Sequence, residues 1–554
     1  MAQRILFLSR LLLALALGSV QTACSRGDGQ DELAVRKSQP ERLPDGRAML
    51  RKGNGAEPES LDPHKSQSTT SSAILRDLYE SLVGEAPNGD LIPGAAESWE
   101  LSPDGLAYTF HLRGNARWSN GQPVTAEDFA WSLRRSVDPA TASVYSAVLS
   151  PILNAADVAA AKRPPAELGV EAVDAKTLRI RLKAPTPYFL GLLTHTSTYP
   201  VYRPVVEQYA DQYTAPGKNV SNGAYVIKEW VVSSHIVLER NPQYWDNANT
   251  KIDLVKYLAI DNAESEFKRY LAGELDLTST VPIPQLDWAR TRLPKEYKAH
   301  PSISTYYYGL NLEQPPFKNN PKLRLALSMA LDRQILVQKV TRGGELPAYG
   351  WVPPGIINYT SQKPAWADWP RDRQVAEARR LYSEAGYSEA KPLQIEIRYN
   401  TSEGHKKIAA AISAMWKMTL GLQTSLVNEE WKVLLDNVSA KKITQVYRAG
   451  WVGDYNDAFT FAELMLSRFG LNGTGYTSPQ YDALVDAAAY EGDVMQRREL
   501  LQQAEQVLLA DQPLLPIYFY VNKRLVKPYV QGYKGNVMDH IYTKNLAIDL
   551  PVKN

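Results

Sequence analysis

The sequence has 554 residues, a length that allows about two to four domains, each able to bury its own core. Apolar residues make up 44% and charged residues 22%, which is ordinary for a soluble globular protein. The 62 basic and 60 acidic side chains give a formal charge of +2, so no chain-wide positive field attracts nucleic acid and partners have to be sought in local patterns.

The N-terminus has the pattern of an export signal. Arginines precede an apolar run at residues 11–17, which is too short to cross a bilayer and has the length of a signal-peptide core. The only cysteine, Cys24, follows small residues that permit cleavage, and its thiol can receive a diacylglycerol. Residues 1–24 therefore resemble a bacterial lipoprotein signal peptide, although Gln21 stands where an aliphatic residue is usual. Cleavage that releases a free periplasmic protein stays an alternative.

The residues after Cys24 contain no further cysteine, which excludes disulfides, thiol catalysis and thiolate metal sites in the mature chain. Residues 25–48 are polar and carry five basic and five acidic side chains, so they cannot bury enough surface to become ordered. We predict a disordered tether here. The signal implies a periplasmic location of the Gram-negative type, with a possible membrane anchor.

From Met49 on, short strands alternate with compact helices. Period-two alternation or flanking turns predict strands at 50–53, 106–113, 178–182, 393–399 and 515–521. Caps and apolar periodicity predict a helix that carries Ile74, Leu75, Leu78 and Tyr79, helices that begin near 125 and 478, and others at 264–273, 321–340, 372–385 and 494–510. The strands are too widely separated by helices for a sandwich, so the fold class is α/β.

Residues 448–457 have a composition that is unusual for a core strand. Arg448 and Asp454 are six positions apart, and Gly450 and Gly453 lie between them. Glycines allow another backbone to approach closely, and the free N–H and C=O groups of such a segment suit pairing with an added strand. A carboxylate at one end and a guanidinium at the other suit a zwitterion such as a peptide. We hypothesise that Asp454 receives an α-amino group and that Arg448 favours anionic ends.

Two other readings of this segment stay open. An Asp that follows Gly is commonly a turn residue, because its side chain bonds to its own backbone. Asp454, Asn456 and Asp457 also cluster as oxygen ligands of calcium do, but Ala458 and Phe459 then break the spacing of an EF-hand loop.

Several segments together resemble one family, the bacterial oligopeptide-binding proteins of ATP-driven importers (solute-binding protein family 5). The segments are 59–65, 96–99, 118–129, 136–139, 221–225, 347–350 and 448–457. The resemblance runs from about Met49 to near the C-terminus and implies a two-lobed periplasmic-binding-protein (type II) fold with an additional domain and hinge closure. The implied domains are I at 49–79, 204–305 and 522–554, II at 80–203, and III at 306–521.

The resemblance also implies the function. We expect the chain to capture short oligopeptides between its lobes and to deliver them to the permease of an ABC importer, as a monomer, without cofactor, metal or nucleic acid. Asp454 matches the family's acceptor for the peptide ammonium, and Gly450, Trp451 and Val452 form the segment whose backbone pairs with the peptide. Arg448 and His405 match groups near the C-terminal carboxylate, although His405 can also be a solvated residue at a helix start.

Further positions of this chain match the family's ligand site. Tyr145, Trp431 and Tyr520 match aromatic walls around the ligand, and each can instead be ordinary core. Thr69 is also assigned to the ligand site. Four positions lack a charge that the family pattern has: Gln67 and Gly309 replace glutamates, Val438 an arginine and Thr341 a lysine, for which the adjacent Arg342 can substitute. We therefore predict a narrower or more apolar ligand preference.

Two other functions compete with oligopeptide capture. Within the family, a murein tripeptide is the alternative ligand, while dipeptides or a chemoreceptor role fit less well. An enzyme is the rival from another class, but the sequence has no Gly-x-Ser-x-Gly, His-Glu-x-x-His or phosphate-binding glycine loop, and its seven histidines are dispersed. A hydrolase with paired carboxylates needs no spacing rule and stays a distant alternative. We predict a binding protein and no enzyme.

Overall fold

A computed structural model describes residues 40 and 43–549. The predicted signal peptide, the predicted lipidation site Cys24 and most of the predicted tether lie outside the described residues. The prediction of a disordered tether up to residue 48 is wrong for its last residues. The Ala48 N–H donates to Asp253 Oδ2 at 2.9 Å, and Arg47 Nη1 donates to Glu239 Oε1 at 2.5 Å. Acidic partners elsewhere in the chain therefore order residues 43–48.

The described chain forms three main sheets. The first, in the order β1-β10-β9-β8, comprises β1 (Met49–Gly53), β10 (Leu254–Leu258), β9 (His235–Arg240) and β8 (Tyr225–Val231). The second, in the order β4-β5-β7-β6, comprises β4 (Ala96–Leu101), β5 (Ala107–Leu112), β7 (Thr177–Arg181) and β6 (Val170–Ala172). The third, in the order β12-β16-β11-β15-β13-β14, comprises β12 (Leu346–Pro347), β16 (Leu514–Leu525), β11 (Tyr297–Leu310), β15 (Val446–Val452), β13 (Gln394–Asn400) and β14 (Gln423–Glu429).

Helices separate these strands, as the α/β prediction requires. Their bounds are α1 (Thr69–Leu78), α2 (Ala126–Val137), α3 (Ala155–Ala159), α4 (Phe189–Leu192), α5 (Arg203–Tyr209), α6 (Ala263–Leu271), α7 (Leu286–Arg292), α8 (Pro321–Ala330), α9 (Arg333–Ile335), α10 (Arg371–Glu384), α11 (Glu403–Leu420), α12 (Trp431–Ala440), α13 (Phe459–Leu464), α14 (Pro479–Tyr490) and α15 (Val494–Asp511). Two small sheets pair β2 (Val83–Glu85) with β3 (Leu91–Pro93) and β17 (Val530–Gln531) with β18 (Ala547–Ile548).

Local sequence explains where the helices begin. Thr125 caps α2 through a capping box with Asp128, and Ser478 caps α14 with Pro479 in its first turn. The single long helix predicted at 321–340 is wrong. Leu331 is extended, and the Asp332 side chain accepts from the Ile335 N–H and so caps a new helical segment, α9.

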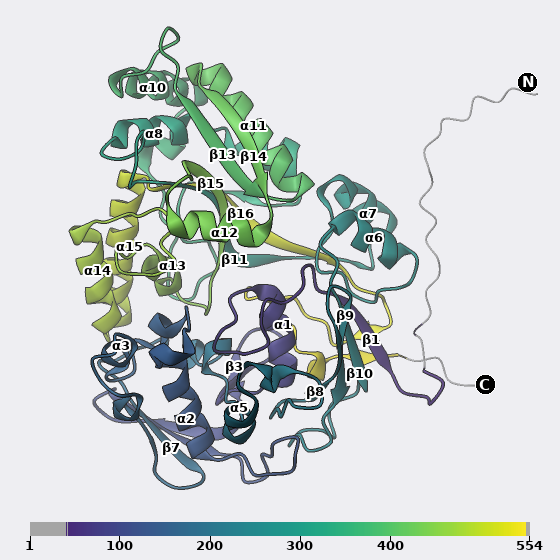
Figure 1. Cartoon of the computed structure of the whole chain (residues 1–554). Helices are drawn as coiled ribbons and strands as arrows, with labels where there is room; N and C mark the ends of the chain where they lie inside the picture. Colours follow the sequence, from purple (N-terminus) through teal and green to yellow (C-terminus); the bar gives the residue numbers. More distant parts are fainter. Residues whose placement is uncertain (1–39, 41–42, 550–554) are drawn as a thin grey trace, which may run out of the picture. The chain divides into compact units, whose positions relative to one another are not determined.

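The two longest strands, β11 and β16, are antiparallel neighbours and carry the chain between the first and third sheets (Figure 1). At the far end of β16, Val526 bridges to Leu277, which in turn bridges to β1 at Lys52. The third sheet packs against the core cluster that contains Tyr306, Leu327, Ile412 and Ile517. Within this sheet β11 lies between β16 and β15, so it fixes the position of β15.

A second core cluster joins the helices and sheet at residues 82–193 to segments of residues 303–538. At this junction the rings of Tyr188 and Tyr455 stack with centroids 5.2 Å apart and an interplanar angle of 6°. The Arg497 guanidinium lies 4.7 Å from the Tyr188 ring centroid and forms an ion pair with Asp457 at 2.8 Å. Aromatic and charged contacts thus pack the segment that follows β15 against the start of α4. Within residues 40 and 43–549 no helix has the length and apolar character that a membrane span requires.

Candidate functional site

Strand β15 has one paired and one open edge. On one side it runs antiparallel to β11, with Val452 opposite Ser304. On the other side, β13 pairs with it only at Val446 and Tyr447, so the edge from 448 to 452 meets no further strand within the described residues. An unpaired strand edge is a template for an added extended chain.

The register decides which backbone groups face that edge. The Gly453 N–H donates to Ile303 O at 2.9 Å, so Gly453 is bonded to β11. Because bonding to one neighbour alternates along an antiparallel strand, Gly450 and Val452 direct their backbone groups away from β11. Both residues are exposed. The two residues predicted to pair with a ligand backbone therefore present free N–H and C=O groups.

Asp454 lies two residues beyond the end of β15. Its N–H donates to Thr460 Oγ1 at 3.1 Å, and its side chain is 10% exposed. Its Oδ2 atom is buried and has no hydrogen-bond partner within the described chain. Burial raises the pKa of Asp454 to about 7, although the Thr460 hydroxyl works in the opposite direction. An unpartnered buried carboxylate oxygen is costly unless a donor or a cation reaches it.

Two further carboxylates lie behind Asp454. Glu463 on α13 accepts a hydrogen bond from the Tyr455 hydroxyl at 2.9 Å, and burial, with Asp454 as second cause, raises its pKa to about 8. Asp457 is different, because Arg497 neutralises it through two contacts of 2.8 Å. Of these two carboxylates only Glu463 has no cationic partner among the described residues, so a positive charge that arrives beside Asp454 would be stabilised here.

Arg448 lies at the other end of the open edge. It donates to the Tyr520 hydroxyl at 2.7 Å and to Asn400 Oδ1 at 3.2 Å, and it lies 4.7 Å from the Tyr306 ring centroid. All of these partners are uncharged, and no described carboxylate comes within ion-pair distance of it. Its Nε is buried without an acceptor. Arg448 therefore has charge and hydrogen-bonding capacity left for an anionic group.

His405 and Tyr520 join Arg448 around Tyr306. His405, in the first turn of α11, has its Nδ1 3.3 Å from the Tyr306 hydroxyl. Burial and the nearby Arg448 hold the pKa of His405 well below its usual value, so it is neutral. The rings of Tyr306 and Tyr518 stack with centroids 4.6 Å apart. The site therefore has one cationic and several neutral polar groups at this end.

The remaining predicted aromatic residues lie in different surroundings. Tyr145 is buried, and its ring centroid lies 4.7 Å from that of His195, beside Asp454. Trp451 directs its indole into the core and donates to Thr460 O at 3.0 Å, so only its backbone faces the strand edges. Trp431, the first residue of α12, is 40% exposed.

Within the described residues, no hydrogen bond or ion pair joins the four positions that lack a family charge to the side chain of Asp454 or Arg448. A Cβ at Gly309 would lie 2.2 Å from Tyr447 Cζ, so the Tyr447 ring occupies the space that a side chain at 309 would need. Val438 lies next to the same ring, because a Cβ at Gly473 would lie 2.5 Å from Val438 Cγ1 and 2.8 Å from the Tyr447 hydroxyl. An aromatic ring thus fills the region where the resemblance places charges.

The other departures are also accounted for by local contacts. Thr341 is buried and donates to Glu345 Oε2 at 2.7 Å. Arg342, considered as a substitute for the missing lysine, forms an ion pair with Asp287 on the surface. Gln67 is exposed, and its backbone N–H donates to Glu59 Oε1. Thr69 is exposed as the first residue of α1.

The structure adds residues that the sequence did not indicate. His195 faces Asp454 with its Nε2 at 3.7 Å from Oδ1, and Tyr306 lies under Arg448. His195 follows α4, far from Asp454 in the chain, and no local pattern marks it. Only the tertiary pairing brings these residues together. The described residues contain no group of three or more His, Cys, Asp or Glu side chains arranged to hold a metal ion.

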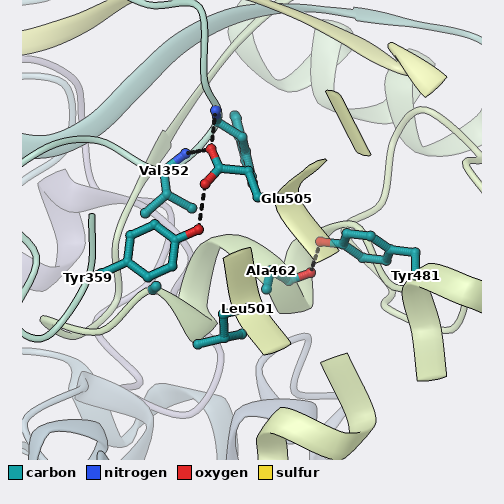
Figure 2. A pocket seen from close by; sticks show the side chains of 8 residues that line it. Val352, Tyr359, Ala462, Tyr481, Leu501 and Glu505 are labelled. Atoms are coloured by element: carbon teal, nitrogen blue, oxygen red, sulfur yellow. Dashed lines mark hydrogen bonds between the residues drawn. The ribbon is translucent and has the colours of Figure 1, made fainter. Parts of the chain in front are cut away.

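A small cavity lies elsewhere in the chain, between Trp351 and Leu501 (Figure 2). It measures about 10 Å³ and surrounds Glu505, which accepts from the backbone N–H groups of Trp351 and Val352 and from the Tyr359 hydroxyl. This volume suits about one water molecule and no organic ligand. A wider hollow of about 570 Å³ between α14 and α15 is lined by alanine, glutamine and aliphatic residues. Neither contains a predicted site residue.

Comparison with known proteins gives consistent matches. The family model "Bacterial extracellular solute-binding proteins, family 5 Middle" matches residues 90–473. The periplasmic oligopeptide-binding protein OppA of Escherichia coli is 43% identical over 503 residues, which cover 90% of this chain and 92% of that protein. The crystal structure of Haemophilus influenzae OppA in complex with the peptide RPPGFSPFR is 41% identical, has a TM-score of 0.86, and is matched over 92% of this chain and 100% of that one. The murein tripeptide binding protein MppA of E. coli has a TM-score of 0.87 at 39% identity, over 91% of this chain and 98% of that one.

Proposed function

The chain belongs to family 5 of the bacterial extracellular solute-binding proteins, and we propose that it captures short oligopeptides outside the cytoplasm and delivers them to the permease of an ABC importer. Its fold is the two-lobed type II fold of these proteins. Like its OppA relatives, which are named as periplasmic proteins, it acts in the periplasm.

The observation that carries the proposal is the open edge of β15 with its two charged ends. Asp454 offers an unpartnered carboxylate oxygen, and Arg448 offers a guanidinium that no described carboxylate neutralises. Between them Gly450 and Val452 present free backbone groups. An extended peptide has an ammonium, a row of N–H and C=O groups, and a carboxylate. The site binds these groups, which all peptides share, and therefore accepts peptides of many sequences.

Native mass spectrometry of the purified, folded protein tests the proposal. We expect a bound mass of a few hundred daltons, which fragments as a peptide and disappears after unfolding and refolding. A protein that carries no peptide, and that binds no member of a tripeptide and tetrapeptide library after refolding, would contradict the proposed function.

We propose the domain division implied by the family for this chain: domain I at 49–79, 204–305 and 522–554, domain II at 80–203, and domain III at 306–521. In support, the strands of the first and second sheets lie wholly within I and II. The strands β11 and β16 are the ones that run across the limit between I and III. The stacked pair of Tyr188 and Tyr455 then joins domains II and III.

A murein tripeptide is the second candidate ligand. The similarity to the murein tripeptide binding protein favours it. The tyrosine ring over Gly309 and the exposed Gln67 leave fewer charges for a ligand's side chains, so we propose a narrower or more apolar preference than in the broad family pattern. Equal affinity for tripeptides with Lys, Glu or Leu side chains would contradict this preference.

The membrane attachment and the assembly are also proposals. We propose that Cys24 carries a lipid that tethers the protein to a membrane, with release as a free periplasmic protein as the alternative, and that the protein is monomeric. The intact mass of the exported protein distinguishes the lipid-anchored form from the free form, because a diacylglycerol adds to the mass. A Cys24→Ala variant should lack this added mass. Light scattering measures the assembly.

We propose that the protein has no enzymatic activity. The family is one of solute-binding proteins, and Asp454 and Glu463 are explained as the surroundings of a bound cation. A peptide recovered intact after prolonged incubation supports this proposal. Its hydrolysis would favour the alternative of a hydrolase with paired carboxylates.

A further inference from the structure

His195 is a buried histidine with a defined tautomer. Its Nδ1 accepts from the Ser197 N–H at 3.3 Å and lies 2.8 Å from Ser197 Oγ. Burial lowers the pKa of His195 to about 3, so the ring is neutral and carries one hydrogen. Since Nδ1 is an acceptor, that hydrogen is on Nε2.

The Nε2–H faces the carboxylate of Asp454. The distance from Nε2 to Oδ1 is 3.7 Å, and both side chains are about one-tenth exposed. The other oxygen, Oδ2, has no partner within the described chain. The imidazole thus approaches one oxygen of the pair and leaves the second one available.

The ring is held in this place from two sides. The Tyr145 ring lies against it, with centroids 4.7 Å apart, and Ser197 holds Nδ1. His195 follows α4 and Asp454 follows β15, so the contact joins the proposed domains II and III. It forms only when these two domains are in contact.

We propose that His195 is a positioning residue for peptide binding, which orients the Asp454 carboxylate so that Oδ2 receives the ligand's ammonium. The inference rests on the proposed function. At 3.7 Å the contact is longer than a hydrogen bond, so the neutral imidazole acts through its dipole, which favours one orientation of the carboxylate without cancelling its negative charge and without repelling the ammonium. A cationic side chain at the same place would do both.

Calorimetric titration of tri-alanine and N-acetyl-tri-alanine into refolded, peptide-free protein tests the role. We expect His195→Ala to weaken tri-alanine binding about tenfold. His195→Gln, whose neutral amide presents an N–H in place of Nε2–H, should bring the affinity back to within about threefold of wild type. Binding of the acetylated peptide, measured by competition, should not change. His111→Ala is the matched control, since His111 lies on β5 away from Asp454.

The outcomes separate the inference from the proposed function. If wild-type protein binds neither this tripeptide nor any peptide of the library, the proposed function fails and the inference falls with it. If wild type binds but His195→Ala weakens free and acetylated peptides equally, His195 only packs the core and the inference alone is overturned.

A second measurement uses the unaltered protein, in case the variant fails to fold. In ¹⁵N NMR of labelled histidines, the His195 Nε2 resonance should shift when tri-alanine binds and stay in place with the acetylated peptide. Identical shifts with both ligands would overturn the inference.

Discussion

Asp454 is the residue on which the proposed recognition depends. Its carboxylate is buried, lacks a cationic partner among the described residues, and so has a pKa of about 7 in place of a value near 4. Removing one partner of a buried ion pair costs about 3–5 kcal/mol. We expect Asp454→Asn to weaken the binding of peptides with a free amino terminus by about two to four orders of magnitude at about 1.4 kcal/mol per decade.

Calorimetry with free and N-acetylated versions of one peptide measures this effect. The acetylated peptide should bind wild type as weakly as the free peptide binds the variant. Asp436→Asn, an exposed change on α12, is the control that should leave the affinity unchanged. Equal binding of free and acetylated peptides to wild type would show that Asp454 does not receive the ammonium.

The same carboxylate predicts a pH dependence. The raised pKa means that Asp454 holds a proton below about pH 7 in the closed, ligand-free site, and an ammonium has to displace that proton. His195 and His405 stay neutral over this range, because burial lowers both pKa values. The affinity should therefore fall about fivefold from pH 7 to pH 6 and nearly tenfold per unit below that. Above about pH 8 it should fall again as the peptide's amino group loses its proton.

Titration of one tripeptide between pH 5 and pH 9 checks this curve, with Asp454→Asn as the variant whose acid limb should be missing. A flat profile from pH 5 to pH 7 would show that the carboxylate is already ionised in the free protein. In that case the ligand-free protein does not hold Asp454 in the buried position seen here.

Arg448 leads to a corresponding prediction for the C-terminal end of the ligand, where a free carboxylate should bind better than an amide. Its hydrogen bonds go to the neutral groups of Tyr520 and Asn400, so its charge is left for an anion. Arg448→Gln should weaken peptides with a free C-terminal carboxylate about tenfold to a hundredfold and change little for their C-terminal amides. Competition assays with acid and amide pairs measure this, and equal losses for both would assign Arg448 a purely structural role.

The sequence alone indicated Asp454 and Arg448 as site residues but did not indicate the residues that lie beside them in the fold. Asp454 and Arg448 are conspicuous as opposite charges at the ends of a glycine-containing segment. His195 and Tyr306 come from distant segments and acquire a role only through the fold, so no spacing rule reveals them. The substitution of Arg342 for the missing lysine was a reasonable expectation from adjacency, but Asp287 pairs with this arginine.

At the scale of elements, the backbone N–H groups of β15 alternate in direction. Those of one set bond to β11 and stabilise the sheet, and those of the other set face the open edge, where a ligand would bind. The Ala449 N–H faces β11, whereas the Val452 N–H faces the open edge. Proline removes an N–H group and is tolerated in a strand where that group is unpaired. Val452→Pro should therefore weaken peptide binding about tenfold and leave the melting temperature nearly unchanged.

Ala449→Pro is the matched control for this prediction. It removes a hydrogen bond to β11 and should lower the melting temperature clearly, by several degrees or more. Circular dichroism melts and peptide titrations on both variants measure the contrast. If Val452→Pro unfolds the protein as readily as Ala449→Pro, the edge is not free.

The elements that sequence reasoning predicted well are those with local signals. The capping box of α2 and the alternation in β5 identified both elements. The long strand β11 was missed, because residues 302–310 are buried on both faces and so lack a period of two. The break after α8 was missed because the apolar periodicity continues through Leu331, whose extended backbone ends α8 before Asp332 caps the start of α9.

At the scale of the whole molecule, the family resemblance indicated which parts of the chain come together, and sequence periodicity does not carry this information. No pattern within residues 80–203 or 306–521 indicates that they meet, yet the rings of Tyr188 and Tyr455 stack and Arg497 covers Tyr188. Hinge-closing proteins hold a ligand through such contacts, since every interaction made on closure adds to the apparent affinity. We therefore expect the affinity for a peptide to be distributed between the ligand site and the contact of the proposed domains II and III.

This division predicts a variant that weakens binding without touching the ligand. Tyr188→Ala removes the stack with Tyr455 and the surface that Arg497 covers, while Asp454, Arg448 and the open edge of β15 are left unaltered. We expect about a tenfold loss of affinity that is equal for free, acetylated and amidated peptides, because the closed state itself is destabilised. Tyr188→Phe, which keeps the ring, is the control and should bind nearly as wild type does. Small-angle scattering should show the Tyr188→Ala protein more open at saturating peptide, and a loss confined to peptides with a free amino terminus would place Tyr188 in the ammonium site and not in the closure contact.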